Sequence, residues 1–284
     1  MQNSRVEDIK FYSKKTIRIG EKLISIDSPL VMGIINCTPD SFFKESRFNS
    51  ISSALKAVEQ QIKEGVDIVD IGAYSSRPGA ENVSEEHEIS RLIPVIKAVR
   101  NEFPDLKLSI DTFRGKVAEE GILSGANIIN DIGAFDLDPN MISVLKKNKV
   151  PYILMHCKGN PQTMQSETNY DSIFKELCYF FSSKINQLKS FGINDIILDP
   201  GFGFAKTMEQ NYHLLDSLID FNFLNQPILV GISRKSMLYK KLNTSPEKVL
   251  NGTSILNTKA IINGASILRV HDVKEAKEIL SLLK

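Results

Sequence analysis

Eight short apolar runs recur along the chain, and longer amphipathic stretches separate them. Each run has the length and the apolar or β-branched character of a strand, so we predict eight strands joined by helices. A strand, a helix and a second strand form the repeating unit of a parallel sheet. The predicted strands are LVMGIIN from Leu30, VDIVDIG from Val66, LKLSID from Leu106, ANIIND from Ala126, VPYILMH from Val150, NDIILDP from Asn194, PILVGIS from Pro227 and ASILRVH from Ala265.

Eight such units predict an α/β fold of the (β/α)₈ TIM-barrel type, with a doubly wound sheet as the alternative. The segment TIRIGEKLISID, which starts at Thr16, predicts a short N-terminal β-hairpin that plugs the end of the barrel opposite the active face. No Gly/Ser-rich linker divides the chain, so we expect residues 1–284 to form a single domain.

The composition limits the partners of this chain. Its 35 basic and 34 acidic residues give a formal charge of +1, which provides no net attraction to nucleic acid or to an anionic membrane. No apolar run approaches the roughly 20 residues of a membrane span. Three scattered cysteines are too few for a disulfide framework and indicate a reducing compartment. We therefore expect a cytoplasmic protein with small-molecule ligands, without nucleic-acid or membrane partners.

Polar residues stand at the end of every predicted strand. In a (β/α)₈ barrel the carboxyl ends of all strands meet at one face, where the active site lies, so these side chains are expected to surround one cavity. Any single one of them is more often a turn former or a helix cap. The set is Asn36, Asp70, Asp111, Asn130 with Asp131, His156, Asp199, Ser233 with Arg234 and Lys235, and Arg269 with His271.

Two groups of residues favour a phosphorylated ligand. The SSRPG stretch from Ser75 offers hydroxyl groups and an arginine, and Arg269 and His271 provide further donors for phosphate oxygens. A surface turn and a barrel salt bridge would explain the same residues. The chain has no G-x-x-x-x-G-K-[ST] loop, and the GFGF stretch from Gly201 lacks the third glycine of a dinucleotide site.

A metal site made of protein ligands alone is not indicated. His156 and Cys157 are neighbours on a predicted strand, so they point to opposite faces and cannot share a zinc ion. Asn36 suits a different role, as one oxygen ligand of a Mg²⁺ ion that substrate phosphates and water hold. No activating pattern surrounds Cys37 or Cys157, so a covalent nucleophile is not favoured.

Buried carboxylates at the strand ends need matching partners. Asp111 and Asp199, with the amide of Asn130 and the ammonium of Lys235, form a mixed donor and acceptor lining. Such a lining suits the edge of a flat heterocycle, because each unpaired buried group would cost about 1–3 kcal/mol.

Eight sequence blocks follow one another along nearly the full length of the chain: GIINCTPDSFF, DIVDIGAYSSRPGA, SIDTFR, NIINDI, YILMHCKGNPQTMQ, IILDPGFGFAK, GISRKSML and ILRVHDV. In sequence and in order, these blocks resemble those of the bacterial dihydropteroate synthases, a family of folate biosynthesis.

The resemblance implies a Mg²⁺-dependent condensation of 6-hydroxymethyl-7,8-dihydropterin diphosphate with 4-aminobenzoate, by an SN1-like route, to give 7,8-dihydropteroate and diphosphate. It also implies a homodimer and a target for sulfonamides. Carried over by motif, the pterin site is Asp111, Asn130, Asp199 and Lys235, with Met155 near the ring. The diphosphate and metal site is Asn36, Arg269 and His271.

The second substrate would bind beside mobile loops. The resemblance places around 4-aminobenzoate the residues Phe42, Ser76, Arg77, Pro78, Phe204 and Ser236, and it marks as catalytic Asn36, Arg77, Lys235, Arg269 and His271. Two alternatives share the pterin contacts: a methyltetrahydrofolate methyltransferase, and a catalytically silent pterin-binding paralogue. The SSRPG, SRKS and RVH blocks favour the synthase over the methyltransferase, and the presence of both mobile-loop motifs argues against the silent paralogue.

Overall fold

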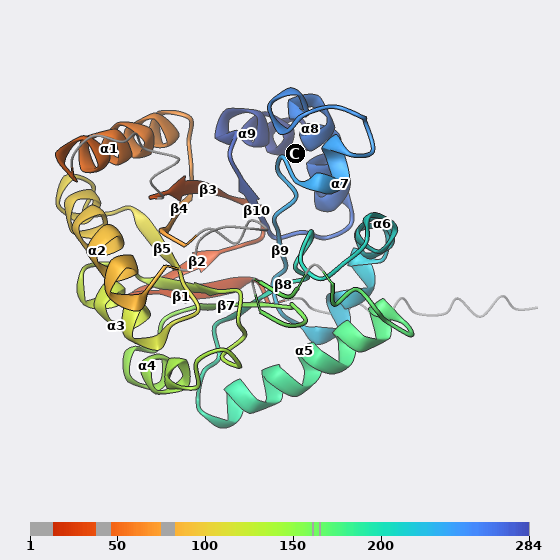
Figure 1. Ribbon diagram of the computed structural model, residues 1–284, viewed down its shortest axis with the longest axis horizontal. Coiled ribbons are helices and arrows are strands. Elements are labelled where there is room, and N and C mark those ends of the chain that lie inside the picture. Colours follow the sequence, from red (N-terminus) through yellow and green to blue (C-terminus); the bar gives the residue numbers. More distant parts are fainter. Residues whose placement is uncertain (1–13, 38–46, 75–82, 161, 165, 284) are drawn as a thin grey trace, which may run out of the picture.

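A computed structural model describes residues 14–37, 47–74, 83–160, 162–164 and 166–283, and it shows a ring of parallel strands surrounded by helices (Figure 1). In the described chain, eight strands pair in parallel in the order β8-β7-β6-β5-β4-β3-β10-β9. Leu198 forms a parallel bridge with Ile228, which closes the ring between its two outermost strands. The strands are β3 Leu30–Asn36, β4 Ile68–Gly72, β5 Lys107–Asp111, β6 Ile128–Asp131, β7 Tyr152–Met155, β8 Ile196–Asp199, β9 Leu229–Val230 and β10 Ile267–Val270.

The predicted (β/α)₈ barrel is therefore confirmed, and the doubly wound alternative is wrong because the sheet closes on itself. All eight predicted runs contain a strand, although most strands are shorter than the run. The largest difference is β9, which ends at Val230. Beyond it the chain turns, since the Lys235 N–H donates to the Ile232 carbonyl at 3.1 Å and Arg234 adopts a φ of 57°.

The N-terminal hairpin covers the end of the barrel at which the strands begin. Strands β1 Thr16–Ile19 and β2 Lys22–Ser25 pair antiparallel around a turn at Gly20. Ile17 and Ile19 are buried in one cluster with the side chains that fill this end of the barrel. The predicted plug is confirmed, and it leaves the opposite end for ligands. The barrel residues of this cluster are Met32, Ile68, Ile128, Ile153, Ile197, Leu229 and Ile267.

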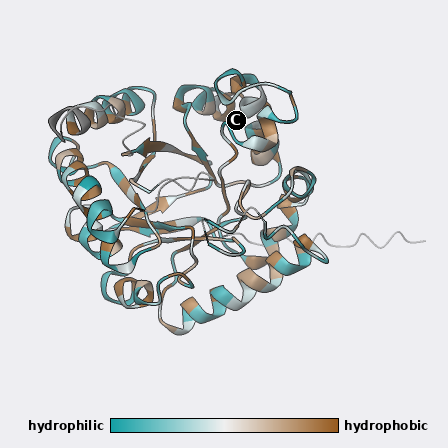
Figure 2. Cartoon of the chain, in the orientation of Figure 1, coloured by the Kyte–Doolittle hydropathy of each residue, from teal (hydrophilic) through white to brown (hydrophobic). Residues whose placement is uncertain are grey.

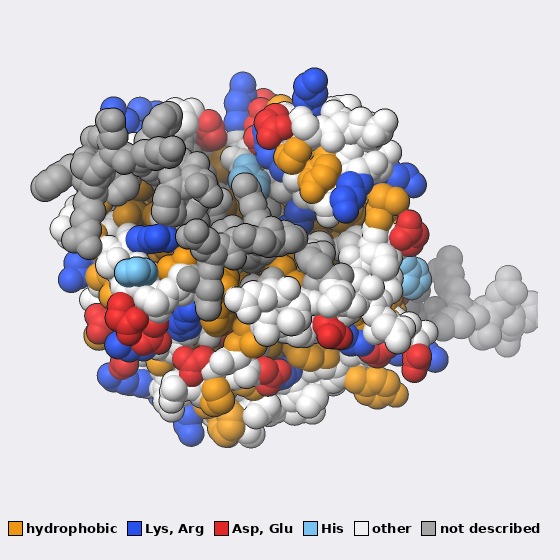
Figure 3. All heavy atoms as spheres, viewed as in Figure 1, with side chains coloured by type: hydrophobic (Ala, Val, Ile, Leu, Met, Phe, Trp, Pro, Cys, Tyr) orange, Lys and Arg blue, Asp and Glu red, His pale blue; other side chains and the backbone are white. Residues whose placement is uncertain are grey.

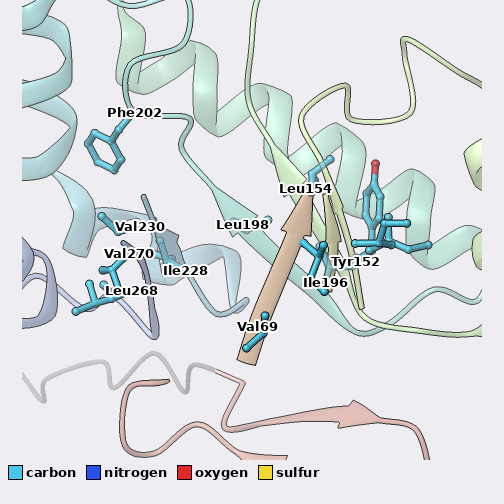
Figure 4. Packing of buried hydrophobic residues seen from close by; sticks show 14 of the residues in the cluster. Val69, Tyr152, Leu154, Ile196, Leu198, Phe202, Ile228, Val230, Leu268 and Val270 are labelled. Atoms are coloured by element: carbon cyan, nitrogen blue, oxygen red, sulfur yellow. The ribbon is translucent and has the colours of Figure 1, made fainter. Parts of the chain in front are cut away.

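Alternate residues of each strand face the helices instead, and they build the larger apolar core (Figure 4). In β7, for example, Tyr152 and Leu154 pack outward, whereas Ile153 belongs to the inner cluster. The helices turn their apolar sides toward these residues and their polar sides toward water (Figure 2). This alternation decides which strand-end residues can reach the inside of the barrel.

The helices follow the strands as predicted. The first of them, α1, runs over Arg47–Lys63 between β3 and β4, with Ala54 and Val58 fully buried. No helix within the described ranges is both long enough and apolar enough to cross a membrane. The helices are α1 Arg47–Lys63, α2 Glu85–Glu102, α3 Gly115–Leu123, α4 Asn140–Asn148, α5 Ile173–Ser190, α6 Met208–Asp216, α7 Ser236–Tyr239, α8 Leu250–Ile262 and α9 Val273–Leu282, with 3₁₀ turns η1 Leu218–Leu224 and η2 Pro246–Lys248.

Candidate active site

A charged network crosses the barrel at its carboxyl end. The Arg269 guanidinium of β10 donates from Nε to Asp70 Oδ2 and from Nη2 to Asp111 Oδ2, both at 2.7 Å. Asn130 of β6 donates from Nδ2 to the same Asp70 oxygen at 2.9 Å. Four strands thus contribute to one network, and Asp70 at its centre has no exposed surface.

Burial and charge act against each other in this network. Burial raises the pKa of Asp111 to about 7, although Arg269 lowers it, and the neighbouring charge of Asp70 adds to the rise. For Arg269, burial lowers the pKa, but the charges of Asp70 and Asp111 outweigh that effect and raise it above its usual value. Arg269 is therefore a permanent cation between two carboxylates, one of which can take up a proton near neutral pH.

A second group lies at the end of β8 and in the turn between β9 and α7. Burial raises the pKa of Asp199, while Lys235 and the N–H group of Gly201, which donates to Asp199 Oδ1 at 2.7 Å, lower it. Lys235 donates from Nζ to the Phe202 carbonyl at 2.6 Å, and Nζ lies 4.4 Å from the centre of the Phe204 ring. Burial lowers the pKa of Lys235 to about 8, and Asp199 opposes this.

The two groups meet around Gly231, the residue after β9. A Cβ atom added at Gly231 would lie 3.8 Å from Arg269 Cβ and 3.9 Å from Lys235 Nζ. The absence of a side chain at this position therefore leaves room between the two cations. Met155, which is 2% exposed, adds an apolar surface next to Asp199, its partner in the register of β7 and β8.

The remaining predicted residues lie at the edge of this end of the barrel. Asn36 ends β3 and alternates with the outward-facing Ile35, so its side chain is on the inner side. His271 is exposed, and its Nδ1 lies 3.0 Å from the Ser233 hydroxyl. Ser236 is the first residue of α7, directly after Lys235.

Three of the polar strand-end residues do not face the cavity, contrary to prediction. Asp131 follows the inward-facing Asn130, so it points outward, where it accepts from the Tyr152 hydroxyl at 2.6 Å. His156 packs against Phe180, with ring centres 4.9 Å apart. Arg234 donates to Asp272 at the surface.

Four predicted site residues lie outside the described residues: Phe42, Ser76, Arg77 and Pro78. Asp70 is one of the polar strand-end residues, and its contacts with Asn130 and Arg269 give it a role that the sequence does not indicate. Lys206, which is 5% exposed and donates to three carbonyl groups beside the site, was missed. Its only sequence signal was a basic residue in an otherwise apolar stretch.

The described side chains make neither a metal cage nor a reactive thiol. Within the ranges that the structure covers, no group of three or more His, Cys, Asp or Glu residues could hold a metal ion. Burial raises the pKa of Cys37 to about 12 and that of Cys157 to about 11, so neither is a thiolate at neutral pH. The site offers hydrogen bonds and charge instead of a nucleophile.

Comparison with known proteins agrees with this geometry. The family model for pterin binding enzymes matches residues 32–271. A dihydropteroate synthase of Synechocystis sp. is 41% identical over 97% of this chain and 96% of its own length. The dihydropteroate synthase of Escherichia coli K12 is also 41% identical, over 92% of this chain and 93% of its own.

Solved structures give the same result. A Yersinia pestis dihydropteroate synthase in complex with a sulfonamide drug has a TM-score of 0.88 and 37% identity, covering 94% of this chain and 98% of that one. A Xanthomonas albilineans dihydropteroate synthase with 4-aminobenzoic acid has a TM-score of 0.88 and 33% identity, covering 95% of this chain and 97% of that one.

Proposed function

Because the chain belongs to the dihydropteroate synthase family of pterin-binding enzymes, we propose that it joins 6-hydroxymethyl-7,8-dihydropterin diphosphate to 4-aminobenzoate. The products are 7,8-dihydropteroate and diphosphate. The observation that carries this proposal is the convergence of Asp111, Asn130, Asp199, Lys235 and Arg269 at the carboxyl end of one barrel, next to the apolar Met155.

The pterin edge is matched by acceptors and donors from opposite sides of the barrel. The Asp199 carboxylate accepts from ring N–H and amino groups, while Lys235 donates to ring acceptors. Asn130 is fixed in orientation by its bond to Asp70. The second oxygen of Asp70, Oδ1, is buried and has no hydrogen-bond partner among the described residues, so Asp70 acts on the substrate only through Asn130 and Arg269.

Two residues at the carboxyl end of β10 can donate hydrogen bonds to the departing diphosphate: Arg269, whose guanidinium stays charged, and the exposed His271. Both stabilise negative charge that increases as the C–O bond breaks. The electron-rich pterin ring stabilises the positive charge left on its exocyclic methylene group, so the route is SN1-like. The arylamine of 4-aminobenzoate then attacks this carbon, and no enzyme nucleophile takes part. This agrees with the raised pKa values of Cys37 and Cys157.

The donor set fits Mg²⁺ in the manner predicted from the sequence. Asn36 offers one amide oxygen at the inner edge of β3, and Mg²⁺ commonly takes only one or two protein ligands and fills its other positions with phosphate oxygens and water. Bound there, the ion would neutralise charge on the diphosphate. The chain's own contribution is to orient that diphosphate between Asn36, Arg269 and His271.

We expect Asn36→Ala to raise the Mg²⁺ concentration for half-maximal activity about fivefold, since one lost ligand bond costs about 1 kcal/mol. The measurement is the initial rate against Mg²⁺ concentration, together with a thermal melt. Asn127→Ala is the matched control, because Asn127 accepts from the Leu108 N–H at 2.9 Å near the start of β5. It should lower the melting temperature and leave the metal curve unchanged. An unshifted metal curve for Asn36→Ala would contradict the assignment.

The proposed reaction is tested by following diphosphate release from the purified chain. Release should require both substrates and Mg²⁺, and 7,8-dihydropteroate should accumulate in equal amount. A methyltetrahydrofolate methyltransferase would instead transfer a methyl group to a corrinoid. A silent paralogue would bind the pterin and release nothing.

We also propose that residues 1–284 form one cytoplasmic domain that assembles as a homodimer through α8. This helix is apolar on two sides: Leu256 and Ala260 pack inward, whereas Ile255 and Ile262, two turns apart, are 58% and 66% exposed. Leu242 lies beside α8 near Gly252 and is 56% exposed. Exposed apolar side chains that lie together on an outer helix mark an interaction surface, and a second copy of the same face supplies that cover. Figure 3 shows both acidic and basic side chains around the rim of the face that it draws.

Ile255→Glu combined with Ile262→Glu should convert the dimer to a monomer. Burying two unpaired charges costs at least about 3 kcal/mol, or more than about hundredfold in dissociation constant. Sedimentation velocity at micromolar concentration measures the mass. Leu123→Glu, at a residue of α3 that is 68% exposed, is the control and should stay dimeric. A monomeric parent chain would refute the proposed dimer.

A further inference from the structure

A buried lysine holds the segment between β8 and α6. Lys206 is 5% exposed, and its Nζ lies 3.0 Å from the Phe204 carbonyl oxygen and 3.1 Å from that of Gly201. On the other side, Nζ lies 3.3 Å from the His156 carbonyl oxygen and 3.1 Å from His156 Nδ1. One amino group therefore joins the segment 200–206 to the end of β7.

This segment has a backbone that needs such support. Gly201, Gly203 and Ala205 have φ values of 70°, 82° and 49°, in the left-handed region that is disfavoured for residues with a side chain. Gly201 also touches β7 closely, because an added Cβ would lie 2.1 Å from the His156 carbonyl oxygen. Contacts from outside the segment must stabilise this conformation.

The same segment carries a residue of the proposed second-substrate pocket. Phe204 has its carbonyl held by Lys206 and its ring 4.4 Å from Lys235 Nζ. Lys235 in turn donates to the Phe202 carbonyl. Two lysines thus hold the segment from two sides, Lys206 from the β7 side and Lys235 from the β9 side. Tyr170 also stabilises the segment, since its hydroxyl donates to the Ala205 carbonyl at 2.9 Å.

We propose that Lys206 is a positioning residue for the aromatic second substrate, because its contacts fix Phe204 at the place where the ring of 4-aminobenzoate packs. The inference rests on the proposed function and adds a residue that does not itself touch either substrate. It predicts unequal effects on the two substrates. The second substrate is affected most, because Lys206 holds the Phe204 carbonyl directly. The pterin site is affected less, because it meets the segment only where Asp199 accepts from the Gly201 N–H and Lys235 donates to the Phe202 carbonyl.

The test is steady-state kinetics of the full chain with both substrates. Burial lowers the pKa of Lys206 to about 7, against the opposing effect of Cys157 and Asp199, so the assay is run at pH 6.5, where the ammonium form predominates. Lys206→Met should raise KM for 4-aminobenzoate about tenfold or more, as a displacement of about 1 Å costs up to about hundredfold. KM for the pterin diphosphate should stay within about twofold.

Lys184→Met is the matched control, since Lys184 is another buried lysine at the same end of the barrel. It donates to the Ala134 carbonyl at 3.1 Å and pairs with Asp136, in the segment after β6. Its loss should leave KM for 4-aminobenzoate unchanged. Equal effects of the two variants, or equal changes in both KM values for Lys206→Met, would overturn the proposal.

Two further variants keep the test decisive if Lys206→Met does not fold. Tyr170→Phe removes only the bond to Ala205 and should raise KM for 4-aminobenzoate about two- to threefold in the same selective way; an unchanged KM would overturn the proposal.

Phe204→Ala tests whether Phe204 lies at the site of the second substrate. If Phe204→Ala raises this KM and neither Lys206→Met nor Tyr170→Phe does, the role of Lys206 is wrong. If Phe204→Ala has no effect, the placement of the second substrate is wrong instead.

Discussion

An Arg269→Met variant should lose about 3–5 kcal/mol of its free energy of unfolding at pH 8 and nearly all of its activity. Removing one partner of a buried ion pair leaves an uncompensated charge in the interior, which is among the largest single-residue effects known. Here two carboxylates lose the same partner, Asp70 with no exposed surface and Asp111 beside it. The activity falls because the main cation for the departing diphosphate is removed.

The decrease in the free energy of unfolding caused by Arg269→Met should depend on pH. Burial gives Asp111 a pKa of about 7 in the folded parent chain, above the ordinary 3.8, so the folded state binds this proton more tightly than the unfolded state. The parent therefore loses stability from this group as pH rises from about 4 to 7. Without Arg269 the pKa of Asp111 rises further, so the variant continues to lose stability from this group as the pH rises above 7. The difference between variant and parent should be larger at pH 8 than at pH 6.

Urea denaturation of both proteins at pH 6 and pH 8 measures this difference. Arg234→Met is the matched control, because Arg234 forms a partly exposed pair with Asp272 at the same end of the barrel. The control should lose only about 1 kcal/mol or less, with little change between the two pH values. A similar loss for both variants would show that Arg269 is an ordinary surface cation and not the centre of a buried network.

Asp199→Asn should weaken binding of the pterin about ten- to more than hundredfold while the barrel remains folded. The Asp199 carboxylate is held by the Gly201 N–H at 2.7 Å and faces the interior with Lys235. A charge-assisted bond to the ring N–H groups contributes about 1.5–3 kcal/mol, and an amide cannot accept from both donors. Titration calorimetry with the pterin ligand measures the affinity, and circular dichroism checks the fold.

Asp131→Asn is the control that separates the pterin contact from general damage to a buried carboxylate. Asp131 is also buried and ends the strand β6, but it accepts from Tyr152, Gly133 and Phe135 on the outer side of the barrel. Its variant should be less stable and should bind the pterin with unchanged affinity. Unchanged affinity for Asp199→Asn, or an equal loss for both variants, would remove Asp199 from the proposed pterin site.

The amino-acid sequence by itself determined the strands, the barrel and much of the site. The eight apolar runs each contain a strand because the apolar pattern of a strand is local, and so is the polar residue that ends it. The position of Asn36, Asp111, Asn130, Asp199 and Arg269 at one end of the barrel then follows from the parallel order of the strands.

Only the tertiary structure decided which neighbours face the cavity and which pair with one another. Asn130 and Asp131 are equal candidates in the sequence, and the strand register sends one inward and the other toward Tyr152. Arg269 meets Asp111 and Asp70 across 158 and 199 residues of chain, a pairing that depends on closure of the barrel. The role of Lys206 could not be predicted from its one sequence signal, a basic residue in an apolar stretch, because three of its partners are backbone carbonyl groups, which every residue has. Strand and helix patterns depend on residues that are close in the sequence, whereas long-range hydrogen bonds form only when the whole barrel has closed.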